Sequence, residues 1–136
     1  MKNLMKTLSL IAICYLFAGC TLQAQTPSEL VQTQLDAYNN RELEAFLEPY
    51  SDTVKIYNFP NEFRYQGKET MRNNYGGMFE RLKDLNCKLV NRMVSGNTVI
   101  DHESVLFNAD QPRREVFAIY KVAHGKIQEV YFVRPE

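Results

Sequence analysis

Apolar residues recur at helical intervals in three segments between residues 26 and 82. The first segment follows Thr26, a suitable N-cap, and Glu29 stands where it can complete a capping box. Its apolar positions are Leu30, Val31, Leu35 and Tyr38. The second segment is short, and its apolar positions are Leu43, Phe46, Leu47 and Tyr50. The third follows Gly67, and its apolar positions are Met71, Tyr75, Met78, Phe79 and Leu82. The spacing predicts three helices.

Strand-like patterns occupy most of the remaining chain. One run covers residues 54–59, and four more follow at residues 87–94, 98–107, 113–123 and 126–133. Gly96-Asn97 and His124-Gly125 are typical of two-residue hairpin turns. The predicted order is therefore α-α-β-α-β-β-β-β. Helices grouped first and antiparallel strands grouped last predict an α+β domain, with three N-terminal helices packed on one face of a curved, mostly antiparallel sheet.

The N-terminus has the pattern of an export signal. Lys2 and Lys6 supply positive charge, and an almost continuous apolar run extends from Leu8 to Phe17. That run is about ten residues long, whereas a helix that crosses a bilayer needs about 20. We therefore expect residues 1–19 to be a signal peptide that is removed on export.

The signal ends at a cysteine. Residues 16–20, Leu-Phe-Ala-Gly-Cys, resemble the lipobox of bacterial lipoproteins, in which the cysteine thiol receives a diacylglycerol before cleavage. We expect residues 20–26 to be a lipidated Cys20 with a tether, and residues 27–136 to form the domain. The protein would then be anchored to a membrane of the cell envelope. The alternative is ordinary cleavage near Ala24, which would leave the protein periplasmic or secreted.

Charge and cysteine content narrow the possible functions. The 16 basic and 16 acidic residues cancel, and loss of Lys2 and Lys6 with the signal leaves a charge of about −2. Such a chain is not attracted to phosphate backbones, so we expect no nucleic-acid partner. Once Cys14 and Cys20 are discounted, Cys87 is the remaining thiol, and we expect it to be a small buried residue on a strand.

The element order and several residues resemble the nuclear transport factor 2-like superfamily. The resemblance rests on Gln32…Tyr38-Asn39, on Leu43…Phe46 before Tyr50-Ser51-Asp52, and on Gly67 ahead of the third helix. Within the superfamily, SnoaL-like polyketide cyclases and ketosteroid isomerases are the most similar. The resemblance covers about residues 28–133. It implies a cone-shaped fold with a pocket open at one end, and a homodimer formed through the outer sheet face.

Asp101 and Glu103 are the candidate catalytic groups. On a strand they share one face with Val99 and Val105, about 7 Å apart. Burial of that face in a pocket would shift both pKa values, so one protonated and one ionised carboxyl group could perform acid–base chemistry. The alternative is a solvated sheet face, on which Arg92 and other cations balance both charges across the ladder.

The candidate ligand-binding residues are Tyr38, Tyr57, Tyr75, Arg92 and His102. Arg92 lies across the Gly96-Asn97 turn from Asp101 and Glu103, so it can pair with either. Consecutive side chains on a strand diverge, so Asp101-His102-Glu103 cannot supply three convergent ligands. We therefore expect no metal and no cofactor.

The resemblance to ketosteroid isomerases does not extend to their two key groups. Gln34 stands where those enzymes place the oxyanion tyrosine, and Asn58-Phe59 stand where they place the proton-shuttling aspartate. Three functions remain open: binding of a small, mostly apolar molecule; an isomerase, cyclase or hydrolase using Asp101 and Glu103; and an interaction or dimerisation module whose cone is filled by side chains.

Overall fold

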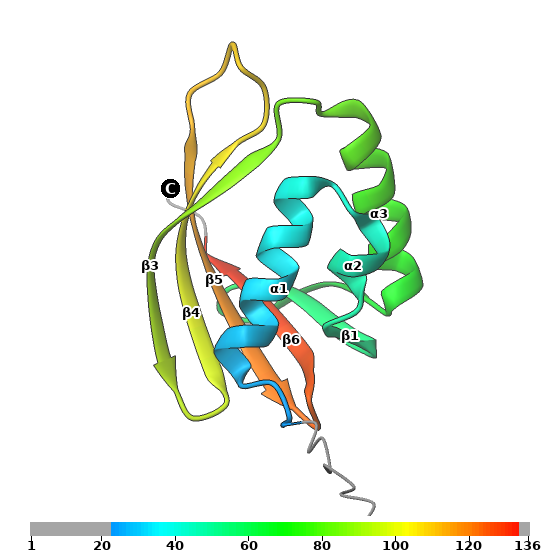
Figure 1. Ribbon diagram of the computed structural model, residues 1–136, viewed down its shortest axis with the longest axis vertical. Helices are drawn as coiled ribbons and strands as arrows, with labels where there is room; N and C mark the ends of the chain where they lie inside the picture. The colour runs from blue at the N-terminus through cyan, green and yellow to red at the C-terminus, as the bar shows by residue number, and fades with distance from the viewer. Residues whose placement is uncertain (1–22, 134–136) are drawn as a thin grey trace, which may run out of the picture.

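The computed structural model describes residues 23–133 as an α+β domain (Figure 1). Its helices are α1 (Pro27–Asn40), α2 (Leu43–Leu47) and α3 (Lys68–Arg81). Its strands are β1 (Tyr50–Asn58), β2 (Glu62–Gln66), β3 (Asn86–Ser95), β4 (Thr98–Leu106), β5 (Arg114–Ala123) and β6 (Lys126–Val133). No helix in this part of the chain is long and apolar enough to cross a membrane. The predicted signal peptide and the predicted lipidation site Cys20 lie outside the described residues.

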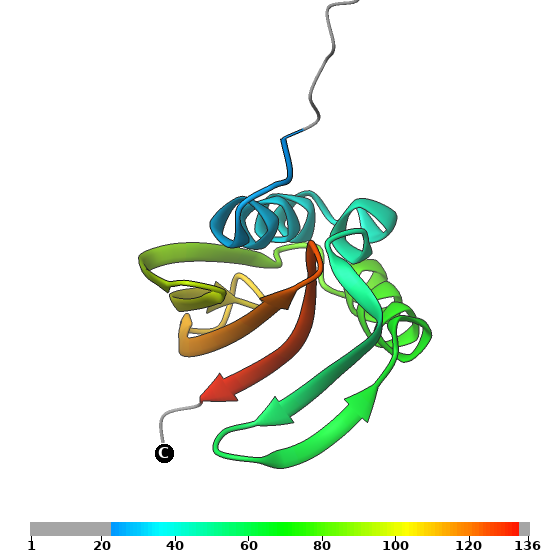
Figure 2. The same ribbon diagram turned by 90° about the horizontal axis from the view of Figure 1, so that it is seen from below.

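The six strands form one curved sheet in the order β2-β1-β6-β5-β4-β3. Strands β1 and β6 are parallel, and every other neighbouring pair is antiparallel. The helices lie on the concave face of the sheet (Figure 2). The predicted α+β class, with three helices packed on a curved and mostly antiparallel sheet, is confirmed.

The structure adds one strand to the predicted order and moves the start of another. Strand β2 is only five residues long and pairs with β1 alone at the sheet edge. Phe63 and Tyr65 alternate with polar residues there, but the run is too short to be distinctive. Tyr50, predicted on the apolar face of the second helix, is instead the buried first residue of β1.

Both ends of α1 are fixed by side chains. The predicted capping box is present: Thr26 N donates to Glu29 Oε2 at 2.7 Å, and Glu29 N donates to Thr26 Oγ1 at 3.2 Å. Near the other end, the Asn39 amide donates to the Cys87 carbonyl at 2.9 Å and accepts from the Cys87 amide at 2.7 Å. The two hydrogen bonds between Asn39 and Cys87 join the end of α1 to the backbone of β3 and fix the position of the helix on the sheet.

A buried ion pair joins the first turns of α1 to the sheet. Arg92 Nε and Nη2 each donate to a different Asp101 oxygen at 2.7 Å, and Asp101 has no exposed surface. Arg92 Nη1 also donates to the Ser28 carbonyl at 3.2 Å and to Gln32 Oε1 at 3.0 Å. Of the two partners predicted for Arg92, the structure selects Asp101.

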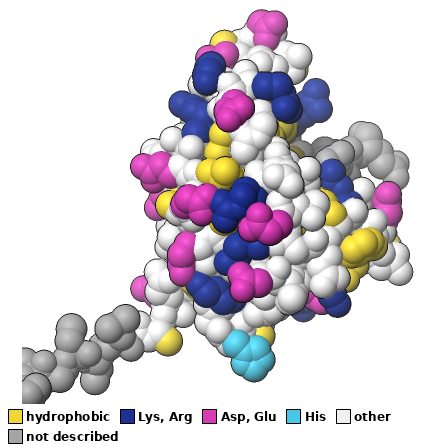
Figure 3. All heavy atoms as spheres, turned by 90° about the vertical axis from the view of Figure 1, so that its right-hand side faces the viewer, with side chains coloured by type: hydrophobic (Ala, Val, Ile, Leu, Met, Phe, Trp, Pro, Cys, Tyr) yellow, Lys and Arg dark blue, Asp and Glu magenta, His cyan; other side chains and the backbone are white. Residues whose placement is uncertain are grey.

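Ion pairs on the surface join α3 to its neighbours. Arg72 contacts Glu44 of α2, and Lys68 Nζ lies 3.1 Å from Asp52 Oδ1 of β1. The partner carboxylates are largely exposed, so these pairs contribute little stability. Figure 3 shows basic and acidic side chains interspersed on this side of the molecule.

Apolar side chains form a continuous row on the outer face of the sheet. Strand register places one residue from each strand in this row, which runs through Met93, Ile100, Ile119, Tyr131, Tyr57 and Phe63. Tyr57 and Tyr131 stack with ring centroids 4.7 Å apart, and Tyr57 contacts Phe63 at 5.7 Å. This one row of the outer face is therefore apolar from one edge of the sheet to the other.

Replacing Arg92 by glutamine should destabilise the domain strongly, because it leaves the Asp101 carboxylate buried without a cation. The expected loss is about 3 kcal/mol of the free energy of unfolding, measured by urea denaturation. Lys88→Gln, an exposed cation on the same strand, is the matched control and should change stability little. Equal effects of the two substitutions would show that the buried ion pair does not hold α1 on the sheet.

Candidate functional site

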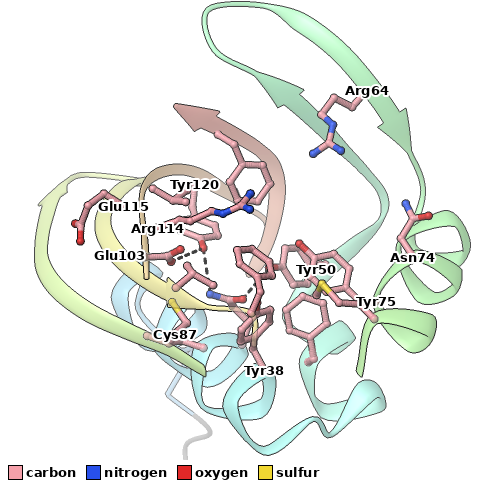
Figure 4. Close-up of a pocket in the computed structure, with 18 of the residues that line it drawn as sticks. Tyr38, Tyr50, Arg64, Asn74, Tyr75, Cys87, Glu103, Arg114, Glu115 and Tyr120 are labelled. Carbon is pink, nitrogen blue, oxygen red and sulfur yellow. Dashed lines mark hydrogen bonds between the residues drawn. The ribbon is translucent and has the colours of Figure 1, made fainter. Parts of the chain in front are cut away.

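The concave side of the sheet encloses a cavity of about 800 Å³ that opens to solvent. Helices α1, α2 and α3, strand β2 and the inner face of the long strands all contribute to its wall. Most of the wall is aromatic or aliphatic, and Figure 4 shows the polar groups that interrupt it. The aromatic residues are Tyr38, Phe46, Tyr50, Tyr65, Tyr75, Phe107, Tyr120 and Phe132.

Aromatic rings from three helices pack in tilted or edge-to-face pairs on one side of the cavity. Phe46 of α2 lies 4.5 Å from Tyr75 of α3 and 6.0 Å from Tyr38 of α1, measured between ring centroids. Tyr38 contacts Phe79 at 5.6 Å. Such tilted pairs fix ring positions, so this wall is rigid and apolar before any ligand arrives.

The structure places three of the predicted site residues on the cavity wall. Tyr38, Tyr75 and Glu103 line it. Asp101 is buried on the same strand face as Glu103, as the alternation predicted, but it lies beneath the start of α1 and does not line the cavity. Arg92 is held by Asp101 and by α1, and it does not line the cavity either.

The remaining two predicted ligand-binding residues lie on the outer face of the sheet. Tyr57 stacks on Tyr131 there. His102 stacks on Phe117 with ring centroids 4.5 Å apart and contacts the Glu115 carboxylate. His102 alternates with the buried Asp101 and Glu103, so its side chain points away from the cavity.

Four buried polar side chains form a hydrogen-bonded chain along the cavity floor, which Figure 4 shows as dashed lines. The Tyr50 hydroxyl donates to Gln34 Oε1 at 3.0 Å. Gln34 Nε2 donates to the Tyr120 oxygen at 3.2 Å. The Tyr120 hydroxyl donates to Glu103 Oε1, also at 3.2 Å. The chain crosses from β1 through α1 and β5 to β4, and it ends on the carboxylate.

Glu103 is the ionisable group at the end of this chain of hydrogen bonds. Burial and the neighbouring charge of Asp101 raise the pKa of Glu103 to about 7, although donors on Tyr120 and Cys87 lower it in part. Both protonation states are therefore populated near neutral pH. Burial raises the pKa of Tyr120 well above its ordinary value, so its hydroxyl stays protonated and can donate.

Cys87 stands beside Glu103 and is buried, as predicted for a strand residue. Burial and the negative charge of Glu103 raise the pKa of its thiol far above the ordinary range. The thiolate is therefore disfavoured, and Cys87 acts as a weak donor rather than as a nucleophile.

Gln34 and Tyr120 are site residues that the sequence analysis did not assign. Gln34 falls on the apolar face of α1, one turn after Leu30 and one turn before Tyr38. A buried polar residue on such a face requires hydrogen-bond partners, which is the signal that could have identified it. Tyr120 shares the inner face of β5 with Ala118, and only the tertiary structure shows its partners.

The described residues contain no group of three or more His, Cys, Asp or Glu side chains placed to hold a metal ion. What the site offers is a carboxyl group that gains and loses a proton near neutral pH, next to an aromatic cavity. This arrangement can bind an apolar molecule and can move a proton to or from it.

Solved structures share the fold. A cystatin-fold protein from Novosphingobium aromaticivorans is similar at 21% identity with a TM-score of 0.73, covering 81% of this chain and 99% of its own. An NTF2-like protein of unknown function from Cytophaga hutchinsonii is similar at 18% identity with a TM-score of 0.67, and the match covers 82% of this chain and 91% of that protein. A protein provisionally named a ketosteroid isomerase, from Kribbella flavida, is similar at 19% identity with a TM-score of 0.68, and the match covers 81% of this chain and 78% of that protein.

Among curated proteins none matches the chain. The family model described as the SnoaL-like domain matches residues 31–130, from the second turn of α1 to the middle of β6. That match spans most of the sequence and contains the cavity floor. The chain therefore belongs to the SnoaL-like domain family.

Proposed function

We propose that this domain binds a small, mostly apolar molecule in its cavity. The observation that carries the proposal is an open space of about 800 Å³ with largely aromatic walls. Sites for small organic molecules have volumes of roughly 300–1,000 Å³ and are lined in the same way. An interaction module whose cone is filled by side chains would leave no open cavity of this size.

A second candidate function is proton transfer on the bound molecule. It is favoured by the position of Glu103, whose pKa is raised to about 7 at the cavity floor. Asp101 does not share this role, because Arg92 occupies both of its oxygens. In this function Glu103 removes or delivers the proton, and the chain of Tyr120, Gln34 and Tyr50 orients it. The names of similar structures include a provisional polyketide cyclase.

Two further proposals concern the setting of the domain. The apolar row on the outer sheet face supports a homodimer in which two such faces meet. The Leu-Phe-Ala-Gly-Cys segment supports anchoring of the mature protein in the cell envelope through Cys20. Native mass spectrometry of protein purified from its own host would report both the subunit number and a retained small molecule.

Filling the cavity should abolish binding of an apolar probe. Val116 is on the inner face of β5 and lines the cavity, so Val116→Trp places an indole in the ligand's space. We expect the affinity for N-phenylnaphthylamine, a neutral fluorescent probe, to fall about tenfold or more. Lys121→Trp is the matched control, because it adds the same ring at an exposed outer-face position of the same strand, outside the apolar row. Similar affinities for the two variants would contradict a cavity site.

The raised pKa of Glu103 should make stability depend on pH. The folded state holds this proton more tightly than the unfolded chain, whose pKa is near 4.5. The stability it confers is therefore fully present below pH 4.5 and is lost as pH rises through 7. Glu103→Gln should reduce the stability difference between pH 5 and pH 8 by about 2 kcal/mol, measured by urea denaturation at both values.

Glu80→Gln, which neutralises an exposed carboxylate on α3, is the control for this measurement and should leave the pH dependence close to that of the unsubstituted protein. A Glu103→Gln variant whose stability depends on pH in the same way as that of the unsubstituted protein would show that Glu103 does not titrate near neutral pH. That result would also contradict the proton-transfer function.

Cys20→Ser should release the protein from membranes, because serine cannot form the thioether to diacylglycerol. Cell fractionation followed by mass spectrometry of the mature N-terminus measures both location and lipid. Cys14→Ser, which lies inside the expected signal peptide, is the control and should leave membrane association intact. Membrane association that survives Cys20→Ser, or a mature chain that starts after Ala24, would reject the lipid anchor.

A further inference from the structure

Two arginines stand at the opening of the cavity. Arg64 comes from the edge strand β2 and Arg114 from the start of β5, and both line the cavity while remaining exposed to solvent. Figure 4 shows their side chains directed from opposite walls toward the same opening. The two strands lie far apart in the sheet order, so the curvature of the sheet is what brings these charges to one site.

Neither guanidinium is neutralised by a neighbour within residues 23–133. No carboxylate of that range lies within ion-pair distance of Arg64 or Arg114, whereas Arg72 pairs with Glu44 and Glu69, and Arg92 pairs with Asp101. Arg114 instead lies over the Phe107 ring, 5.4 Å from its centroid. This cation–π contact holds the charge at the cavity wall and leaves its donors unused.

The positive charge at the opening contrasts with the rest of the wall. Below the opening the lining is aromatic and aliphatic, and the one buried carboxyl group on it is Glu103 at the floor. Glu115, the residue after Arg114, also lines the cavity, but its carboxylate contacts His102 on the outer face. An anionic group on a ligand would therefore be repelled from the floor and attracted to the opening, where it also stays partly hydrated.

We propose that the cavity takes an amphipathic carboxylate, with an apolar body among the aromatic rings and the carboxylate between Arg64 and Arg114. This inference rests on the proposed binding function and names the class of ligand. Arginine suits the role because its planar guanidinium donates two parallel hydrogen bonds to a carboxylate. The apolar body would lie against Tyr38 and Tyr75 and extend toward Glu103.

The test compares decanoate with decan-1-ol, which share the same apolar chain but differ in the charge of the head group. Binding to the full chain is measured by isothermal titration calorimetry at pH 8, with Cys20→Ser in every variant so that no lipid is attached there. The site variant is Arg64→Gln/Arg114→Gln. The control is Arg81→Gln/Lys88→Gln, which removes two exposed cations outside the cavity and so gives the same net charge.

We expect the parent protein and the control to bind decanoate about tenfold more tightly than decan-1-ol. The site variant should bind both with similar affinity, and its undiminished affinity for decan-1-ol shows that it is folded. Equal binding of the two ligands by the parent protein, or a preference that survives in the site variant, would overturn the carboxylate class and leave the cavity proposal standing. Failure of both ligands to bind the parent protein would overturn both proposals.

Discussion

Strand β4 places two carboxyl groups, Asp101 and Glu103, on one buried face, where both are largely shielded from water. Burial of a carboxylate is costly, and the fold compensates the two groups differently. Asp101 receives two charge-assisted hydrogen bonds from Arg92 and anchors the helix. Glu103 has no such cation bonded to it among the described residues, and burial together with the charge of Asp101 raises its pKa to about 7, although neutral donors lower it in part. The first group holds α1 on the sheet, and the second is the group that the proposed proton transfer would use.

Most of the fold follows from local patterns that the sequence displays openly. Thr26 and Glu29 form the capping box that starts α1, and period-two alternation from Val99 to Val105 identifies one buried face of β4. Strand β2 could not be predicted in this way, because it is only five residues long, four of them are exposed, and it pairs with β1 alone. Tyr50 was misplaced because helical spacing continues past the end of α2 by coincidence.

The candidate site was only partly predictable, because it depends on how deeply each side chain is buried and on contacts between residues far apart in the sequence. Alternation places Asp101 and Glu103 on the same face, but it does not show that α1 covers the first and leaves the second at the cavity. The pairing of Arg92 with Asp101 follows from the short turn between the strands. Arg64 and Arg114 are 50 positions apart in the sequence, and they line the same cavity only because the sheet is curved.

The two ends of α1 serve different parts of the domain. Residues 23–26 lead into the N-terminal end of α1 (Figure 1), where Ser28 contacts Arg92. Tyr38, near the opposite end of the helix, lines the cavity. Anything attached ahead of residue 23 therefore leaves from the side remote from Arg114. A tether at that end would leave the entrance of the cavity unobstructed.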